Sequence, residues 1–479
     1  MRHRTILPVL MLCASILLPQ TAPAAEVVTG AGDQHGMTVT IYNQNLALVH
    51  DQREVSMPAG IVNLVFRDVS AQLQPESAFL RGKDLRVLEQ NFDYDLLTPE
   101  SLLARHLGKE ITILRSHPTT GAESRQTAKV LSVNNGVVLR VGTQIETGMP
   151  GRLAFPGVPE NLRERPALTM QTENANEGKK QLTLSYLTEG LSWQADYQVE
   201  LAADGDSLTL NGWATLHNES GIGFRDARLQ LLAGQLHQVP QARAKPRAML
   251  EAAPAAMAAP APAPAMAAAA FDDFHLYTVG RPTTIGENQR KQVALLSAAG
   301  VPCRRDYVIQ GEPALRHLDK EAPRKVPVGL FLLVRNDKGS KLGSPLPAGT
   351  MRVFRPDTSG TLQLVGEDRI EHTREDGQLR LRLGNAFDVS AERRQTSFNK
   401  VAGGNQPRDA IYECGHEIVV HNARAEEITV QLAETLSGDW KMLEESAPHR
   451  QESAGRITWQ LKLPAHGSER ISYRVRATQ

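Results

Sequence analysis

Two histidines and a cysteine near the C-terminus have the spacing closest to a known catalytic arrangement. His416 and His421 flank Glu417, as two histidines flank a glutamate in zinc proteases. That chemistry needs histidines four residues apart on one helix face, with the glutamate as base. Here the spacing is five residues in a segment with strand periodicity, so the two histidines point to opposite faces. We therefore expect core or surface histidines and no metal site.

Cys414 and His416 could also form a thiol nucleophile with a neighbouring base. Residues two apart on a strand share one face, so the geometry permits this, but a disulfide-bonded or inert cysteine is commoner. Cys303 is the other cysteine beyond the N-terminal segment. If residues 306–309 lie against residues 413–420, an oxidising compartment would favour a Cys303–Cys414 disulfide. The alternative is two buried free thiols.

Other catalytic and cofactor motifs are missing from the sequence. It has no Gly-Lys-Ser/Thr phosphate loop and no Gly-x-Ser-x-Gly elbow. Four tryptophans could stack on sugars, although strand spacing favours a core role for them: Trp193, Trp213, Trp440 and Trp459. We therefore predict no catalytic residue and no cofactor.

The N-terminus resembles a secretory signal peptide, which we assign to residues 1–25. Arg2 and Arg4 precede an apolar stretch, residues 6–18, that is too short to span a bilayer comfortably. Small residues follow, and we expect cleavage after Ala24 or Ala25. No later stretch is long and apolar enough for a transmembrane helix, so the expected location is periplasmic or secreted.

Composition excludes further classes of partner. The chain has 479 residues, with 53 basic and 53 acidic side chains. A balanced charge gives no electrostatic footprint for nucleic acid or an anionic bilayer. A chain of this length is expected to form several domains.

Period-two alternation predicts an all-β fold. Residues 193–201 and 208–216 alternate on either side of Asp204-Gly205, which predicts an antiparallel hairpin. Thr98-Pro99 predicts the start of one short helix. Residues 109–146 resemble a small SH3-like barrel. Near the C-terminus, residues 457–463 are expected to pair with residues 471–475 through a turn.

These patterns divide the chain into several immunoglobulin-like β-sandwich modules with the small barrel as an insert. The expected segments after the signal peptide are an N-terminal β module (26–95), the helix and barrel (96–150), a β-sandwich module (165–239), a disordered Ala/Pro-rich tether (240–270), a second β module (271–400) and a C-terminal sandwich (405–479). The tether has almost nothing to bury. A short helix at residues 266–270 is the alternative for its end.

Several short motifs resemble one bacterial family. They are Gly190-Leu191-Ser192-Trp193, Asp226-Ala227-Arg228-Leu229, Pro345-Leu346-Pro347-Ala348-Gly349 and Leu383-Gly384-Asn385-Ala386-Phe387-Asp388. Their order resembles the domain-of-unknown-function family 4139 over residues 168–476. The resemblance implies paired β-sandwich modules and an exported protein, and no established reaction. Some relatives are called mucoidy inhibitors and carry a coiled coil ahead of this region, where this chain has the barrel-like unit.

The sequence thus favours an exported, non-catalytic binding or scaffold protein of the bacterial cell envelope, with a protein or an envelope polymer as partner. The alternative is a hydrolase of envelope polymers whose carboxylates meet between domains. Two close carboxylates with perturbed pKa values would favour the hydrolase, and an exposed apolar patch would favour binding.

Overall fold

The structure is a computed structural model that describes residues 25–478, except for residues 94–96, 118–119, 135, 150, 160–165, 235, 238–265, 312–321 and 403–409. The expected signal peptide up to residue 24 and most of the expected tether lie outside the described residues. Within the described ranges, no helix combines the length and the apolar character needed to cross a membrane.

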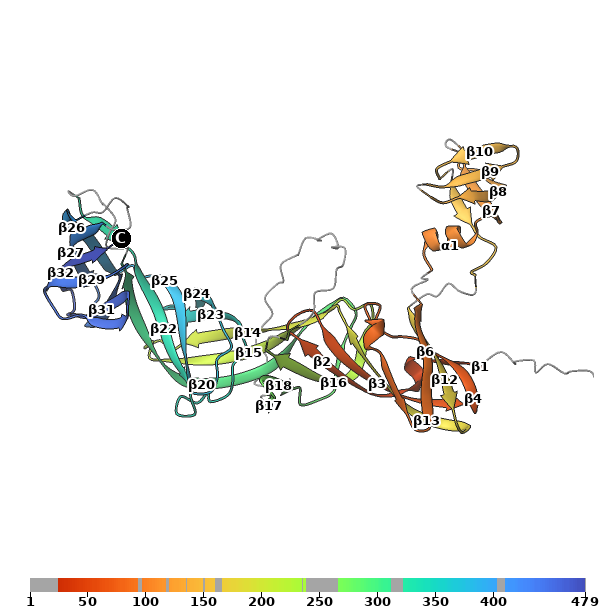
Figure 1. Ribbon diagram of the computed structural model, residues 1–479, viewed down its shortest axis with the longest axis horizontal. Helices are drawn as coiled ribbons and strands as arrows, with labels where there is room; N and C mark the ends of the chain where they lie inside the picture. Colours follow the sequence, from red (N-terminus) through yellow and green to blue (C-terminus); the bar gives the residue numbers. More distant parts are fainter. Residues whose placement is uncertain are drawn as a thin grey trace, which may run out of the picture. The chain divides into compact units, whose positions relative to one another are not determined.

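The described chain consists almost entirely of β-strands, which confirms the all-β prediction (Figure 1). It forms two compact units. One contains residues up to Met37 and Val49–Leu187, and the other contains Thr38–Leu48 and Thr188–Gln479. The boundary falls within strands β2 (Gln34–Tyr42) and β3 (Ala47–Met57).

The N-terminal unit contains a four-stranded sheet in the order β1-β4-β12-β6. Its strands are β1 (Ala25–Thr29), β4 (Gly60–Phe66), β12 (Ala167–Asn174) and β6 (Leu85–Asp93). Strands β3, β13 (Gly178–Thr188) and β5 (Phe79–Gly82) are neighbours in a second sheet, and η1 (Ala31–Asp33) and η2 (Pro75–Ser77) are short 3-10 turns. On β3, alternate side chains are buried, and these include the charged residues Asp51 and Arg53.

The predicted helix begins where its sequence signals place it. The Thr98 hydroxyl accepts a hydrogen bond from the Ser101 N–H at 3.1 Å and caps α1 (Pro99–Arg105). Leu103 packs on a five-stranded sheet in the order β10-β9-β8-β7-β11. Its strands are β7 (Glu110–Ser116), β8 (Glu123–Ser132), β9 (Val138–Val141), β10 (Gln144–Thr147) and β11 (Arg152–Ala154). The short strands β10 and β11 form the two edges of this sheet and do not pair with each other. The sheet is therefore open, where a small barrel was expected.

The larger unit begins with strands in the order β17-β18-β16-β2, and β19 also pairs with β16. They are β17 (Ala267–Phe271), β18 (Phe274–Thr278), β16 (Phe224–Ala233) and β19 (Thr283–Ile285). Residues 267–270 therefore form a strand paired with β18, so both the disordered assignment of these residues and the alternative helix were wrong. The chain reverses direction at Asp272, whose φ of 54° lies in the left-handed region.

A ten-stranded sheet follows the order β24-β23-β14-β15-β20-β28-β31-β30, and β22 joins β20 to β25. Its strands are β14 (Leu191–Leu201), β15 (Ser207–Asn218), β20 (Gln289–Gln310), β22 (Val328–Asn336), β23 (Gly349–Pro356), β24 (Leu362–Ile370), β25 (Gly377–Asn385), β28 (Ile428–Thr435), β30 (Arg450–Ser453) and β31 (Arg456–Leu463).

The hairpin predicted at Asp204-Gly205 is confirmed, because β14 and β15 pair antiparallel from Leu191 to Leu201. On its other side, β14 pairs in parallel with β23. Residues expected in two separate modules, 165–239 and 271–400, therefore contribute strands to one sheet.

The C-terminal sandwich packs this sheet against a five-stranded sheet in the order β21-β26-β27-β32-β29. The strands are β21 (Arg324–Val326), β26 (Val389–Ala402), β27 (Ile411–Asn422), β32 (Ser468–Thr478) and β29 (Trp440–Glu445). The expected pairing of residues 457–463 with 471–475 was wrong. Strand β31 pairs with β28 and β32 pairs with β27, so the turn between them crosses from one layer of the sandwich to the other.

Candidate functional site

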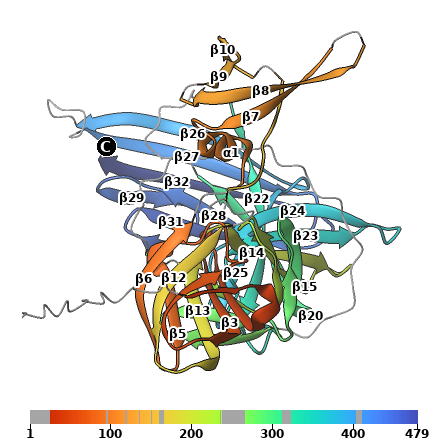
Figure 2. The ribbon, with the colours of Figure 1, turned by 90° about the vertical axis from the view of Figure 1, so that its right-hand side faces the viewer.

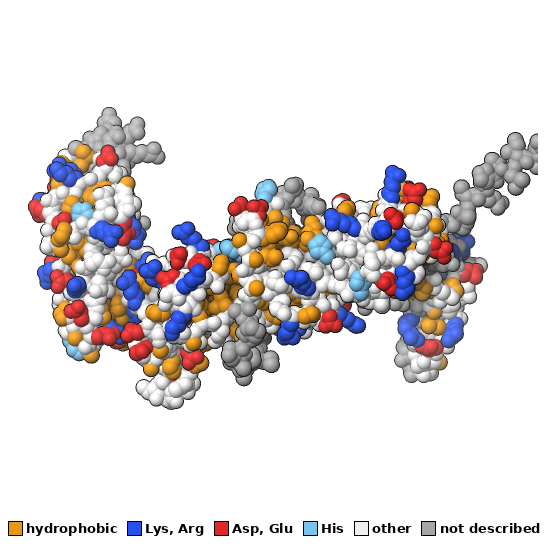
Figure 3. All heavy atoms as spheres, turned by 90° about the horizontal axis from the view of Figure 1, so that it is seen from below, with side chains coloured by type: hydrophobic (Ala, Val, Ile, Leu, Met, Phe, Trp, Pro, Cys, Tyr) orange, Lys and Arg blue, Asp and Glu red, His pale blue; other side chains and the backbone are white. Residues whose placement is uncertain are grey.

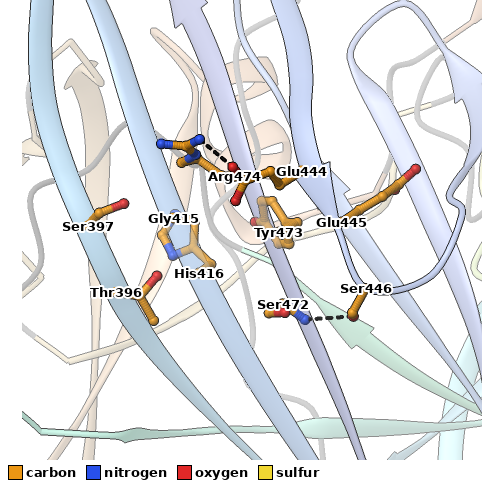
Figure 4. A pocket seen from close by; sticks show the side chains of 10 residues that line it. All are labelled: Thr396, Ser397, Gly415, His416, Glu444, Glu445, Ser446, Ser472, Tyr473 and Arg474. Atoms are coloured by element: carbon orange, nitrogen blue, oxygen red, sulfur yellow. Dashed lines mark hydrogen bonds and ion pairs between the residues drawn. The ribbon is translucent and has the colours of Figure 1, made fainter.

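A cavity of about 480 Å³ opens on the five-stranded sheet of the C-terminal sandwich (Figure 4). We call it the bulge-flanked pocket. Four strands or their ends supply its lining: Thr396, Ser397, Gly415, His416, Glu444, Glu445, Ser446, Ser472, Tyr473 and Arg474.

The pocket lies along one row of paired residues across the sheet. His416 on β27 pairs with Tyr473 on β32, and Tyr473 pairs with Glu445 on β29. A β-bulge interrupts β26 between Gln395 and Ser397. Another interrupts β29 after Met442, so both outer strands of the row are bulged. Bulges re-aim side chains and occur often beside functional sites. Here they allow consecutive residues, such as Thr396 and Ser397, to line one cavity.

Gly415, which pairs with Ser397 and Arg474 in the neighbouring row, provides the space in the pocket. A Cβ atom at this position would lie 2.6 Å from both the Ser397 Oγ and the Thr396 Oγ1. Any larger residue would therefore displace these hydroxyl groups. Glycine is unfavourable in the interior of a strand unless close approach requires it, and the open pocket supplies that requirement.

His416 and Tyr473 form a buried floor, with exposed fractions of 1% and 3%. Their ring centroids are 5.4 Å apart, and Tyr473 stacks on Trp459 at 5.2 Å. Burial is the largest cause that raises the pKa of the Tyr473 hydroxyl well above its usual value, so the hydroxyl stays neutral. It accepts a hydrogen bond from Arg393 Nη2 at 3.2 Å, and Arg393 forms a buried ion pair with Glu434.

Charged and polar groups around the rim are already engaged by neighbours. Arg474 pairs with Glu444, as Figure 4 shows. His449 Nδ1 lies 2.8 Å from Glu445 Oε2. The Ser472 N–H donates to the Ser446 Oγ at 3.0 Å. Each of the two acidic side chains at the opening, Glu444 and Glu445, thus contacts one basic side chain. The remaining polar groups of the lining are mostly hydroxyl groups.

The structure separates the two histidines of the zinc-like motif. His416 lies in the core, whereas His421 is exposed. Glu417 forms ion pairs with Arg394 and Arg470, each at 2.9 Å. Within the described part of the chain, no group of three or more His, Cys, Asp or Glu side chains could hold a metal ion.

The expected Cys303–Cys414 disulfide does not form, and both cysteines are free thiols. The strand order explains the difference. Residues of β20 beside Cys303 pair with β22 and β28, whereas β27, which carries Cys414, pairs with β26 and β32. The Cys303 thiol instead donates a hydrogen bond to the Gly205 carbonyl at 3.6 Å, and Cys414 packs in the sandwich core.

The two thiols should react slowly in the native protein. Burial raises the pKa of Cys303 and of Cys414 to about 11, so only about one thiol in a thousand is a thiolate at pH 8. Ellman's reagent should count two thiols in a denatured, unreduced chain that begins after the signal peptide. In the native protein Cys303 should react before the fully buried Cys414. A count of zero thiols in the denatured protein would show that the Cys303–Cys414 disulfide forms.

Of the four tryptophans, Trp193 and Trp459 are buried and belong to the core, while Trp213 and Trp440 are half-buried. Trp440 lies near the pocket. Its ring is 5.9 Å from that of His449, which contacts the lining residue Glu445. None of these rings lines the bulge-flanked pocket itself.

A second cavity of about 810 Å³ lies where β20 passes from β15 to β28. Its walls carry both signs of charge, including Arg304, Arg305, Asp306, Arg380, Glu426 and Glu452. Arg380 and Asp306 approach to 3.5 Å, and Gln431 Nε2 donates to Glu452 at 3.0 Å. Basic and acidic side chains are likewise interspersed over the face shown in Figure 3. Both of these cavities are therefore lined by acidic and basic side chains together.

Sequence reasoning found the strand that carries Cys414 and His416 but missed the pocket. The bulges on β26 and β29 leave no clear mark in an alternating sequence. One available signal was Gly415, because an isolated glycine inside a strand pattern often marks a bulge or a close backbone approach.

Comparison with known proteins bears on the same region. A comparison with curated proteins finds no match. A family model described as a domain of unknown function, DUF4139, matches residues 182–478, which is more than half of the chain and includes both cavities. The chain therefore belongs to the DUF4139 family.

Proposed function

We propose that this protein is an exported binding or scaffold protein of the bacterial cell envelope, and that the bulge-flanked pocket receives a sugar unit of an envelope polymer. Export rests on the signal-peptide pattern of residues 1–25. The observation that carries the binding function is the pocket itself, which Gly415 and two bulges open on an otherwise packed sheet.

The lining suits a ligand with many hydroxyl groups. The side chains of Thr396, Ser397 and Ser446 carry hydroxyl groups that both donate and accept hydrogen bonds. Its volume of about 480 Å³ falls in the range of small-molecule sites. The rings of His416 and Tyr473 lie buried beneath these groups and support them.

The same geometry favours binding over hydrolysis. A glycosidase-type hydrolase needs a carboxylic acid that stays protonated near neutral pH, and an apolar or acidic surrounding favours that state. Glu444 is instead paired with Arg474, and Glu445 contacts His449. The carboxyl pKa values of Glu54, Asp337, Asp357 and Glu426 are all shifted downward.

Filling the pocket should abolish binding to the envelope polymer. Gly415→Val places a strand-compatible side chain in the cavity, and we expect at least about a tenfold loss of affinity, equivalent to about 1.4 kcal/mol. Ser397→Ala, which removes one hydroxyl without filling the pocket, should cause a smaller loss. Binding is measured by co-sedimentation with purified peptidoglycan sacculi and, separately, with immobilised lipopolysaccharide.

The matched control is Gly280→Val, since a Cβ at Gly280 meets no atom within 4 Å. The protein is recovered from the envelope fraction, where its intact mass should show a chain that begins at Ala25 or Glu26. A wild-type protein that binds neither polymer, or a full-length species confined to the cytoplasm, contradicts the proposal. Release of soluble fragments that is lost in Glu445→Gln would establish a hydrolase instead.

A further inference from the structure

The second cavity, of about 810 Å³, takes no part in the proposed function. Its walls are the turn between β14 and β15, parts of β20, β22 and β25, and parts of β28, β30 and β31. Along this stretch β20 pairs antiparallel with β22 and in parallel with β28 (Figure 2). We call it the junction cavity, and it shares no lining residue with the bulge-flanked pocket.

Tyr307 brings a hydroxyl group to the wall of the junction cavity. The residue is 5% exposed, and its ring packs in the core of the C-terminal sandwich. The charges of Arg305 and Glu426, which also line the cavity, act on the hydroxyl. Burial raises the pKa of Tyr307, so the hydroxyl stays neutral and can donate a hydrogen bond. Among the described residues it has no hydrogen-bond partner, whereas buried hydroxyl groups usually have one. The Tyr307 hydroxyl is therefore available to a ligand.

Arg305 places a cation beside this hydroxyl. It precedes Tyr307 by two residues on β20, so the two side chains lie on the same face of the strand. Its guanidinium lies against Gly205, where a Cβ atom would be only 2.5 Å from Nη2. Arg305 is half-buried and has no ion-pair partner among the described residues. A guanidinium held in this way presents the fork of N–H groups that binds a carboxylate.

Two carboxylates flank Gly205 in the turn between β14 and β15. Asp204 and Asp206 both line the cavity and are exposed. Asp204 Oδ1 accepts a hydrogen bond from the Asp206 N–H at 3.0 Å, which stabilises the turn. Neither carboxylate forms an ion pair within the described part of the chain, although Arg305 lies against the residue between them. Donors for an anion and acceptors for a cation therefore lie next to each other.

Most other acidic side chains of the cavity already have basic partners. They form the pairs Glu426–Arg424, Asp306–Arg380 and Glu452–Arg456. The remaining charged residues of the lining are exposed, namely Arg304, Glu427 and Arg450. The groups gathered around Gly205 are therefore the ones whose charges a single small ligand can meet.

We propose that the junction cavity binds an α-amino-acid zwitterion. Its carboxylate lies at the Arg305 guanidinium and the Tyr307 hydroxyl. Its ammonium group lies at Asp204 and Asp206. A simple anion at Arg305 would also face the two aspartates, and a simple cation at the aspartates would also face Arg305. An α-amino acid carries both charges on one carbon atom, so it is complementary to both sides of the turn.

The size of the cavity leaves two sources for this zwitterion. A volume of about 810 Å³ admits residues attached to the charged centre, so the ligand is either a free amino acid or the free end of a peptide. Isothermal titration calorimetry of the chain without its signal peptide separates the two. The probes are free meso-diaminopimelic acid and the tripeptide L-alanyl-γ-D-glutamyl-meso-diaminopimelic acid, in which one α-amino-acid centre stays free.

A control peptide tests the need for both charges. It has L-lysine in place of meso-diaminopimelic acid, so the amine of its side chain has no carboxylate beside it. We expect at least one probe to bind, and the control peptide to bind at least about tenfold more weakly. Binding of the free acid alone identifies a free amino acid as the ligand, and binding of the tripeptide identifies a peptide.

Variants on each side of the turn test the assignment of the residues. Arg305→Met removes the charge that holds the carboxylate, and Asp206→Asn removes a charge that holds the ammonium group. Each should weaken binding at least about tenfold, and the exposed position of Asp206 means that its variant should keep the fold. Tyr307→Phe removes only the hydroxyl and should cause a smaller loss. Arg394→Met is the matched control, because Arg394 is an exposed arginine outside the cavity.

This binding is independent of the bulge-flanked pocket. Gly415→Val, which fills that pocket, should leave the affinity for the probes unchanged, so the two proposals fail separately. A wild type that binds neither probe, a control peptide that binds as tightly as the tripeptide, or an affinity unaffected by Arg305→Met and Asp206→Asn would overturn the zwitterion site.

Discussion

Replacing Glu434 with leucine should lower the free energy of unfolding of the C-terminal sandwich by about 3–5 kcal/mol, because it leaves the buried charge of Arg393 without its ion-pair partner. The two side chains are 3% and 0% exposed and form a direct ion pair. Arg393 also donates to the Tyr473 hydroxyl beneath the bulge-flanked pocket. Urea unfolding followed by tryptophan fluorescence measures the effect, since Trp440 and Trp459 lie in this sandwich.

The double variant Arg393→Met with Glu434→Leu should recover most of the loss, since removing both charges avoids the desolvation of either. Arg394→Met is the matched control on the same strand. Arg394 faces solvent and pairs with Glu417, so this change should cost less than about 1 kcal/mol. The explanation fails if Glu434→Leu behaves like this control, or if the double variant is as unstable as the single one.

Arg53→Leu should destabilise the N-terminal unit by a similar amount, about 3–5 kcal/mol, with a different pattern of rescue. Arg53 is fully buried and holds Asp51 Oδ2 at 2.7 Å. It also donates to the carbonyls of Thr29 and Arg67, at 3.0 and 2.9 Å. Adding Asp51→Leu should therefore not restore stability, because both carbonyls still lack their donor.

Hydrogen–deuterium exchange of peptides from β3 and β4 is the suitable measurement for Arg53. The four tryptophans all follow residue 187, so fluorescence does not report on this unit. Lys179→Met is the control, since Lys179 pairs with Glu54 at the surface, where it is 73% exposed. Recovery of full protection in the Asp51→Leu, Arg53→Leu double variant would show that the two carbonyls find other partners.

Local patterns predicted individual elements well because these elements depend on neighbouring residues. The alternation around Asp204-Gly205 specified strand, face and partner together, since a short turn brings β14 and β15 side by side. Thr98 and Pro99 similarly placed the start of α1. The matched family region, residues 182–478, was also anticipated from short motifs.

The partners of distant strands could not be predicted in the same way. A period of two indicates a strand with one buried face, and it is the same whichever strand lies beside it. The turn before β32 therefore suggested a hairpin with β31, although the two strands lie in opposite layers. The prediction of a Cys303–Cys414 disulfide was wrong for the same reason, because it assumed a contact between β20 and β27.

The pairing of β2 with β16 has a consequence for the order in which the chain folds. Thr38 lies opposite Arg228 in this parallel pair. Likewise, β14 can pair with β23 only after the ribosome has synthesised the long segment between them. Contacts between residues so far apart in sequence give a high contact order, which slows folding because long loops must close first. A strand synthesised near the N-terminus thus spends time with an unpaired edge, and during that time the nascent chain depends on protection from aggregation.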